Sequence, residues 1–154
     1  KASVMNSILG GGVFSGRLMQ NLREDKGYTY GIGSGLVSLL RDGYFFVSSE
    51  VGVEYCQQAI DEIYAELAGM RKRPAGTEEL ETLKSYLSGS FLRSFDGPFA
   101  QSERFKEVRA FRMSMAHYDG FIKALQQITP EDIMQLSEKY LHEDAMIELV
   151  VGRK

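Results

Sequence analysis

Arg23 and Tyr30 are the side chains of this sequence whose types and spacing could best serve a reaction. A guanidinium stays charged and presents a planar fork of donors, which suits it to hold the carbonyl oxygens of a substrate backbone. A phenol O–H can donate a hydrogen bond to an oxygen that gains negative charge, without titrating at neutral pH. The residues alone favour a plainer interpretation, in which Arg23 is a cation at a helix end and Tyr30 is a half-buried strand aromatic.

Metal-binding and nucleophilic patterns are largely excluded by the residue inventory. His117 and His142 are the only histidines, and neither H-E-x-x-H nor the inverted H-x-x-E-H motif occurs. We expect His117 to be structural and His142 to lie at a solvated helix end. Cys56 is the only cysteine, so an intrachain disulfide and a thiolate cluster are impossible. A Ser/His/Asp triad stays open, but no G-x-S-x-G elbow supports one. We therefore expect no metal or cofactor in this chain.

Two glycine-rich stretches invite comparison with phosphate-binding loops. Residues 10–12 lack the G-x-x-x-x-G-K-[ST] pattern, and residues 31–35 lack the third glycine of G-x-G-x-x-G and do not lead from a strand into a helix. The formal charge is −3 with both signs interspersed, and no Lys/Arg stripe stands out. Nucleotide and nucleic-acid binding are therefore not expected.

The elements that must position the pair are a short helix and a strand. Apolar residues at helical spacing over residues 4–9 stop at the glycines of residues 10–12, and a second short helix follows, with Ser15 as its expected N-cap and an end at Gly27. From Thr29 the period is that of a strand, which places Tyr30 on the side of Ile32, Ser34, Leu36 and Ser38, with glycines on the other. Alternating glycines suggest that something packs closely on their face.

The rest of the chain is mainly helical. Asp42-Gly43 is a strong turn signal, so residues 29–38 and 44–53 form an expected antiparallel hairpin. Helices are expected over residues 53–70, 77–91, 99–114, 118–126 and 129–140, and a short apolar strand over Ala145–Val151. The start at Thr129-Pro130-Glu131-Asp132 is the clearest, with a Thr cap, Pro at the first position and an acid three residues after the cap.

This order predicts a single α+β domain over residues 1–154, with helices packed on one face of an antiparallel sheet. The composition, 44% hydrophobic and 25% charged, suits one good core. Only three strands are visible, so we expect at least one more upstream of Lys1, and the chain to be a fragment of a longer one. No apolar run approaches the roughly 18 residues of a membrane span.

Two stretches of the sequence carry a family resemblance. Residues 6–18, NSILGGGVFSGRL, and residues 22–30, LREDKGYTY, resemble the N-x-x-L-G-G-G-x-x-S-[SG]-R-L and L-R-E-x-x-G-x-x-Y stretches of the C-terminal-type, non-zinc-binding domain of pitrilysin/insulinase-family (inverzincin) metallopeptidases. Asp42–Phe45, Thr77–Leu80, Thr129–Asp132 and the closing Val150–Gly152 are similar to later features of that domain, so the likeness runs essentially end to end.

The resemblance implies a metallopeptidase/processing-peptidase-like fold and half of an active site. In that family one domain holds zinc through H-x-x-E-H, and the other contributes an Arg and a Tyr seven residues later that contact the peptide substrate. Arg23 and Tyr30 match this pair by spacing. Tyr28 is the rival, but it is five residues on and occupies a position that is usually apolar.

Two functions follow as hypotheses. The first is a non-zinc half of a zinc-dependent peptidase, inactive alone and active with an H-x-x-E-H domain in cis or as a partner subunit. The alternative is a catalytically inert structural or assembly module, as in the core proteins of a respiratory complex. Retention of Arg23 and Tyr30 favours the first. The sequence of residues 23–31 is similar to that of bacterial envelope-type members of the family. The periplasm or cell envelope is therefore the favoured location, although the sequence leaves the compartment open.

Overall fold

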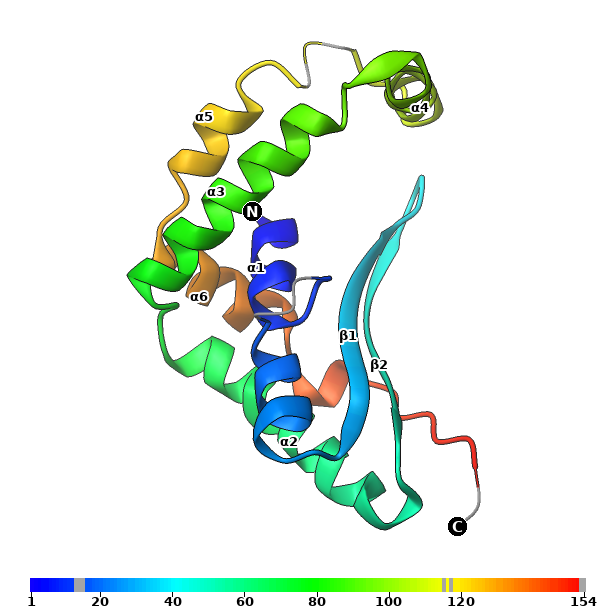
Figure 1. The fold of residues 1–154 in the computed structure, drawn as a ribbon, viewed down its shortest axis with the longest axis vertical. Helices are drawn as coiled ribbons and strands as arrows, with labels where there is room; N and C mark the ends of the chain where they lie inside the picture. The colour runs from blue at the N-terminus through cyan, green and yellow to red at the C-terminus, as the bar shows by residue number, and fades with distance from the viewer. Residues whose placement is uncertain (13–15, 115, 117, 153–154) are drawn as a thin grey trace.

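The computed structural model describes residues 1–12, 16–114, 116 and 118–152 and combines a helical layer with one antiparallel hairpin. Figure 1 shows α1, α2, α3 and α6 to one side of the hairpin, which confirms the α+β arrangement. In chain order the elements are α1 (Ala2–Leu9), the π-helix η1 (Met19–Asp25), β1 (Thr29–Ser38), β2 (Gly43–Val51), η2 (Val53–Tyr55), α2 (Cys56–Lys72), α3 (Thr77–Arg93), α4 (Gly97–Ala110), α5 (Phe121–Gln126), α6 (Pro130–Tyr140) and η4 (Glu143–Ala145).

The core lies between the helices and the inner face of β1. Fully buried leucines come from α1, the η1 segment, α2, α3 and the end of α6, namely Leu9, Leu18, Leu22, Leu67, Leu80 and Leu141. Burial of each such side chain stabilises the fold by about 1.5–3 kcal/mol. The core therefore holds η1, which carries Arg23, between α2 and β1.

The end of α1 is joined to the middle of β1 through its backbone. The Ser34 amide donates to the Gly10 carbonyl oxygen at 2.9 Å, and the Asn6 side-chain amide donates to the Ser34 carbonyl oxygen at 3.3 Å. A Cβ on Gly11 would lie 2.3 Å from Asn6 Nδ2, so a larger residue has no room there. The predicted break at these glycines is therefore a close turn that seats α1 on the hairpin.

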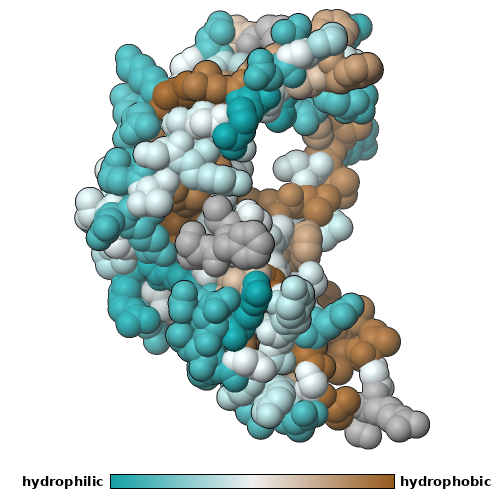
Figure 2. Space-filling view, viewed as in Figure 1, coloured by the Kyte–Doolittle hydropathy of each residue, from teal (hydrophilic) through white to brown (hydrophobic). Residues whose placement is uncertain are grey.

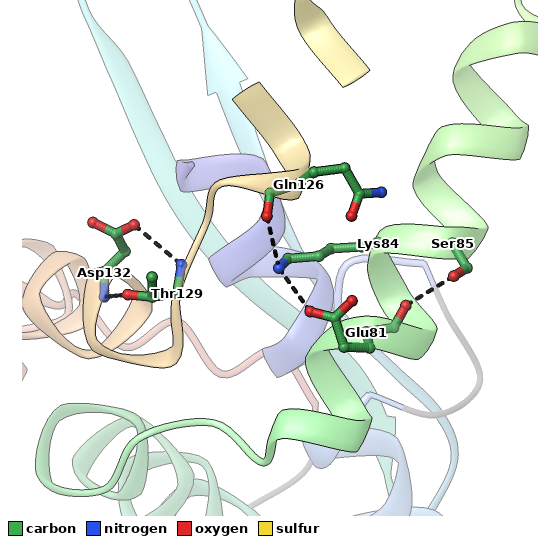
Figure 3. A network of polar contacts seen from close by, with 6 residues as sticks. All are labelled: Glu81, Lys84, Ser85, Gln126, Thr129 and Asp132. Carbon is green, nitrogen blue, oxygen red and sulfur yellow. Dashed lines mark hydrogen bonds and ion pairs between the residues drawn. The ribbon is translucent and has the colours of Figure 1, made fainter. Parts of the chain in front are cut away.

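A buried lysine fastens α3 to the end of α5 (Figure 3). The Lys84 ammonium donates to the Gln126 carbonyl oxygen at 3.1 Å and to Glu81 Oε1 at 2.8 Å. Close by, Thr129 and Asp132 form the capping box that the sequence predicts, with Thr129 Oγ1 accepting from the Asp132 amide at 3.1 Å. Hydrogen bonds with side chains therefore satisfy backbone groups at the end of α5 and at the start of α6.

Two expectations meet a different outcome, and two others fall outside the described residues. The strand predicted over Ala145–Val151 is wrong, because η4 occupies its start and the described residues that follow pair with no strand. Ile147 is 96% exposed there, and Figure 2 shows the apolar colour of this segment at the lower right. The second short helix forms, but it is mainly π-helical rather than α-helical. The expected N-cap Ser15 and the structural role expected of His117 lie outside the described residues.

Among the helices of the described residues, none is both long and apolar enough to cross a membrane.

Candidate functional site

Arg23 and Tyr30 meet although they belong to different elements. The guanidinium carbon of Arg23, from η1, lies 5.0 Å from the centroid of the Tyr30 ring at the start of β1. A cation within about 6 Å of a ring face is attracted by the ring's quadrupole. The Arg23 side chain is 30% exposed, and its Nε lies 3.4 Å from Glu24 Oε1. The structure thus assembles the two residues that the sequence singles out.

Polar contacts to α2 hold η1 in place. Asn21 Nδ2 donates to Glu62 Oε2 at 3.1 Å and to Glu66 Oε1 at 2.7 Å, and the Lys26 ammonium forms an ion pair with Glu62 at 2.5 Å. Hydrogen bonds from Lys26 and Asn21 lower the pKa of Glu62 below its usual value. These contacts, with the buried Leu22, fix the position of η1 and therefore the backbone position from which the Arg23 side chain extends.

A β-bulge determines where Tyr30 points. Thr29 pairs with Val51 and Ile32 pairs with Ser49, so Tyr30 and Gly31 together oppose the single residue Glu50. Bulges of this kind bend a strand and re-aim its side chains. Tyr30 is 88% exposed, whereas Ile32 is 5% exposed. The expectation that Tyr30 shares the face of Ile32 is therefore wrong, because the extra residue breaks the alternation. From Ile32 to Ser38 the pairing is regular, but only Ile32 and Ser34 are buried, whereas Leu36 and Ser38 are exposed.

Two hydroxyl groups occupy the positions that the bulge leaves unpaired. Thr29 Oγ1 accepts from the Gly31 amide at 3.0 Å and lies 2.6 Å from the Glu50 carbonyl oxygen, to which it donates. Ser49 Oγ lies 2.9 Å from Thr29 Oγ1 and 3.0 Å from the Gly31 carbonyl oxygen. These side-chain hydrogen bonds replace the ladder bonds that the extra residue interrupts. Thr29 and Ser49 therefore stabilise the bulge that carries Tyr30.

Tyr28, the rival tyrosine, has a different environment. Its ring stacks on that of Tyr55 with a centroid separation of 5.0 Å and an interplanar angle of 16°. Tyr28 is half-buried and packs against the hydrophobic core. It joins the start of β1 to η2, whereas Tyr30 is the tyrosine that is free to meet another molecule.

An open groove of about 490 Å³ runs along the hairpin beside Tyr30. Its lining comes from two facing stretches, Tyr30–Gly33 on β1 and Ser48–Glu50 on β2. The sequence predicts residues 48–50 as part of a strand but not as part of the site. The Asp42-Gly43 turn indicates which strands pair, but the bulge shifts the register, so counting from the turn does not place Glu50 opposite Tyr30.

The close packing that the alternating glycines of β1 predict occurs at Gly35 but not at Gly31. A Cβ on Gly35 would lie 2.5 Å from the ring of Phe46, its partner on β2, whereas a Cβ on Gly31 would meet no atom within 4 Å. The ring of Phe46 thus covers Gly35, and the space over Gly31 stays open as part of the groove.

Zinc ligation is not a property of the described side chains. Across residues 1–12, 16–114, 116 and 118–152, no group of three or more His, Cys, Asp and Glu residues is placed to hold a metal ion. Cys56 is half-buried at the start of α2, and His142 is exposed beyond the end of α6. The chemistry available at this site is hydrogen bonding and charge, from Arg23, Tyr30 and the groove.

Comparisons with known proteins place these features in a family. The family model described as "Peptidase M16 inactive domain" matches residues 1–87, which include η1, the hairpin and both site residues. A curated relative, described as an uncharacterized zinc protease, YmxG, of Bacillus subtilis, is 27% identical over 147 residues, which are 96% of this chain and 36% of the relative.

Solved structures share the fold. The peptidase M16 inactive domain from Pseudomonas fluorescens superposes with a TM-score of 0.83 at 26% identity, covering 91% of this chain and 33% of that one. The periplasmic protease PqqL from Escherichia coli superposes with a TM-score of 0.73 at 14% identity, covering 91% of this chain and 15% of that one. The chain thus spans about a third of the length of its first relatives.

Proposed function

Because the chain belongs to the peptidase M16 inactive-domain family, we propose that it is the non-zinc half of a zinc-dependent metallopeptidase. In this proposal Arg23 and Tyr30 contact the peptide substrate and support its hydrolysis, which is performed with an H-x-x-E-H domain. The observation that carries the proposal is the contact between the two side chains, of which Tyr30 also lines an open groove. The Tyr30 side chain is 88% exposed, so its hydroxyl is accessible to another molecule.

The chemistry assigned to each residue follows from its donors. The Tyr30 hydroxyl would donate a hydrogen bond to the substrate carbonyl oxygen as negative charge develops on it. The Arg23 fork would hold neighbouring backbone carbonyl oxygens and so fix the register of the peptide. Their mutual contact orients both side chains before substrate arrives, which reduces the ordering cost of binding.

The zinc ion belongs to the other half in this proposal, since the described side chains of this chain offer no ligand group. The residues beyond this chain in its relatives leave room for such a domain in the same polypeptide, because the chain covers 36% of the zinc protease from B. subtilis. We therefore propose that this chain is part of a longer protein and that its partner domain is supplied in cis. The periplasmic structural relative supports the cell envelope as the proposed location.

Kinetics of the full-length protein test the role of the pair. Tyr30→Phe removes only the hydroxyl, and we expect kcat/KM for a cleaved peptide to fall on the order of a hundredfold, the effect of losing one donor to a developing oxyanion. Arg23→Ala should lower kcat/KM as well, and Arg23→Lys should restore little of it because an ammonium lacks the planar fork. Zinc content should stay unchanged in all three variants.

Tyr28→Phe is the matched control for the tyrosine. It keeps the ring that stacks on Tyr55, so activity and stability should stay near wild type. Full activity of both Tyr30→Phe and Arg23→Ala would remove the catalytic-support role and leave the structural or assembly module as the function of this domain.

A further inference from the structure

We propose that Glu50 makes the groove selective for a substrate residue with a basic side chain, Lys or Arg, in an extended peptide segment. This inference rests on the proposed function, because it assigns a substrate class to the same groove. Four features of the hairpin carry it: the face on which the groove lies, its glycine floor, the charge in its lining and the position of that charge beside Tyr30.

The groove lies on the outer face of the hairpin. Along β2 the residues alternate, with Phe45, Val47 and Val51 packed against the core and Ser48 and Glu50 exposed. Gly33 pairs with Ser48, and Gly31 shares with Tyr30 the position opposite Glu50. Paired residues of an antiparallel ladder share a face, so these residues form one continuous outer surface.

Glycines leave this surface low enough for another chain to lie on it. A Cβ on Gly31 would project into open space, with no atom within 4 Å. Tyr30 stands at one end of this floor, and the ring of Phe46 covers Gly35 beyond the other end. Every second side chain of an extended peptide points the same way, so a residue seated here places its side chain between these aromatic ends.

Glu50 is the one charged residue in the described lining of the groove. Its carboxylate has no hydrogen bond or ion pair among the described residues. The carboxylates that contact η1 are already engaged, since Glu24 lies against Arg23 and Glu62 and Glu66 accept from Asn21. An exposed carboxylate without a partner among the described residues, in the lining of an open groove, is complementary to an ammonium or a guanidinium.

Arg23 and Glu50 then have separate tasks on the same peptide. The Arg23 guanidinium lies over the Tyr30 ring and beside Glu24, where it can serve backbone carbonyl oxygens. Glu50 lies across the ladder from Tyr30 and Gly31, where its carboxylate can form an ion pair with a substrate side chain that lies above Gly31. The selectivity for charge is therefore a property of β2, whereas support of the reaction is a property of η1 and β1.

The test measures charge selectivity in the full-length protein. Quenched fluorogenic peptides are compared that are identical except for Lys, Gln or Glu at a single position, scanned over each position that flanks the cleaved bond. At one position we expect the wild-type protein to prefer Lys over Gln by about two- to fivefold in kcat/KM, the range of an exposed ion pair. The preference should shrink as salt is raised.

Two variants of Glu50 give opposite results if the inference holds. Glu50→Gln should bring the Lys-to-Gln ratio at that position to about one, and Glu50→Lys should make the Glu peptide the better substrate. Glu138→Gln removes an exposed carboxylate from α6 and is the matched control, which should keep the wild-type ratio. Thermal unfolding of each variant confirms that the fold is intact, as expected for an exposed side chain.

The outcomes separate this inference from the proposed function. A ratio that is unchanged in Glu50→Gln and Glu50→Lys at every scanned position overturns the role of Glu50, even if Tyr30→Phe lowers the rate as expected. Conversely, a full rate in Tyr30→Phe and Arg23→Ala, with a ratio that still depends on Glu50, retains the groove as a peptide site and refutes only the catalytic support.

Discussion

Tyr30 and Ile32 are two residues apart, yet one side chain faces solvent and the other is buried in the core. In a regular strand they would share a face. The bulge opposite Glu50 places them on different faces. The hydroxyl groups of Thr29 and Ser49 form hydrogen bonds with the Gly31 backbone in place of the strand partners that the bulge displaces. At the scale of single residues, the exposure of Tyr30 therefore depends on a threonine that never needs to touch substrate.

Thr29→Val tests this dependence. Valine keeps the β-branched shape but removes the hydroxyl, which leaves the Gly31 amide and the Glu50 carbonyl oxygen without that partner. We expect a loss of about 0.5–1.5 kcal/mol in the free energy of unfolding, the net contribution of a hydrogen bond between partly exposed groups. Urea denaturation followed by circular dichroism measures it. Thr29→Ser keeps the hydroxyl and should recover most of the loss; equal losses in both variants would contradict the role of the hydroxyl.

Among the elements, η1 and β1 each contribute one residue of the site and must be held in register with each other. The π-helical backbone of η1 is fixed on α2 by Asn21 and Lys26, and the turn to β1 passes through Gly27 at φ +64°. Single π-helical turns occur frequently at functional sites. Arg23 thus reaches Tyr30 because two elements are anchored independently, one on α2 and the other on β2.

Glu62→Gln should weaken the anchor of η1 in a pH-dependent way. The folded protein lowers the pKa of Glu62 below the ordinary value of 4.5, so its stabilisation is fully present above that value and is lost as pH falls through the lowered pKa. At neutral pH we expect the variant to be less stable by about 0.5–1 kcal/mol, the range of a partly exposed pair. The difference from wild type should shrink below about pH 4.5.

Urea midpoints measured across this pH range check the expectation, with Asp61→Asn on the same helix as the control. Asp61 is exposed, and among the described residues it accepts only from Gln57 within α2, so its replacement should have little effect at any pH. A stability difference for Glu62→Gln that grows as pH falls would contradict the assignment.

In the whole molecule, the site faces outward from a two-stranded sheet whose other face carries the core. Apolar side chains near the hairpin tip and along residues 147–151 remain exposed in the described chain (Figure 2). The pair Arg23–Tyr30 and the groove form an open surface rather than an enclosed pocket. Under the proposed function, this surface supports the reaction once a second surface closes over the substrate.

Separation of the two halves tests this view. Residues 1–154 produced alone, after circular dichroism shows that they are folded, should bind no stoichiometric zinc and should not cleave a peptide that the full-length protein cleaves. Addition of the separately produced zinc half should restore cleavage. Metal analysis and a fluorogenic assay measure the two quantities, and peptide cleavage by the isolated chain would refute the division of the site.

The sequence by itself determined the features that depend on local chemistry. The glycine break after α1, the Asp42-Gly43 turn, the capped start of α6 and the α+β class are confirmed, because turn residues, caps and apolar periodicity act within a few residues. The resemblance also singled out Arg23 and Tyr30. The tertiary structure alone decided that the two side chains meet, that a bulge turns Tyr30 outward and that Glu50 lies across from it. It also decided that residues 145–151 form no strand. The turn indicates that the two strands pair, but the bulge depends on how they meet, and the exposure of residues 145–151 depends on whether another strand pairs with them, so neither follows from the local pattern.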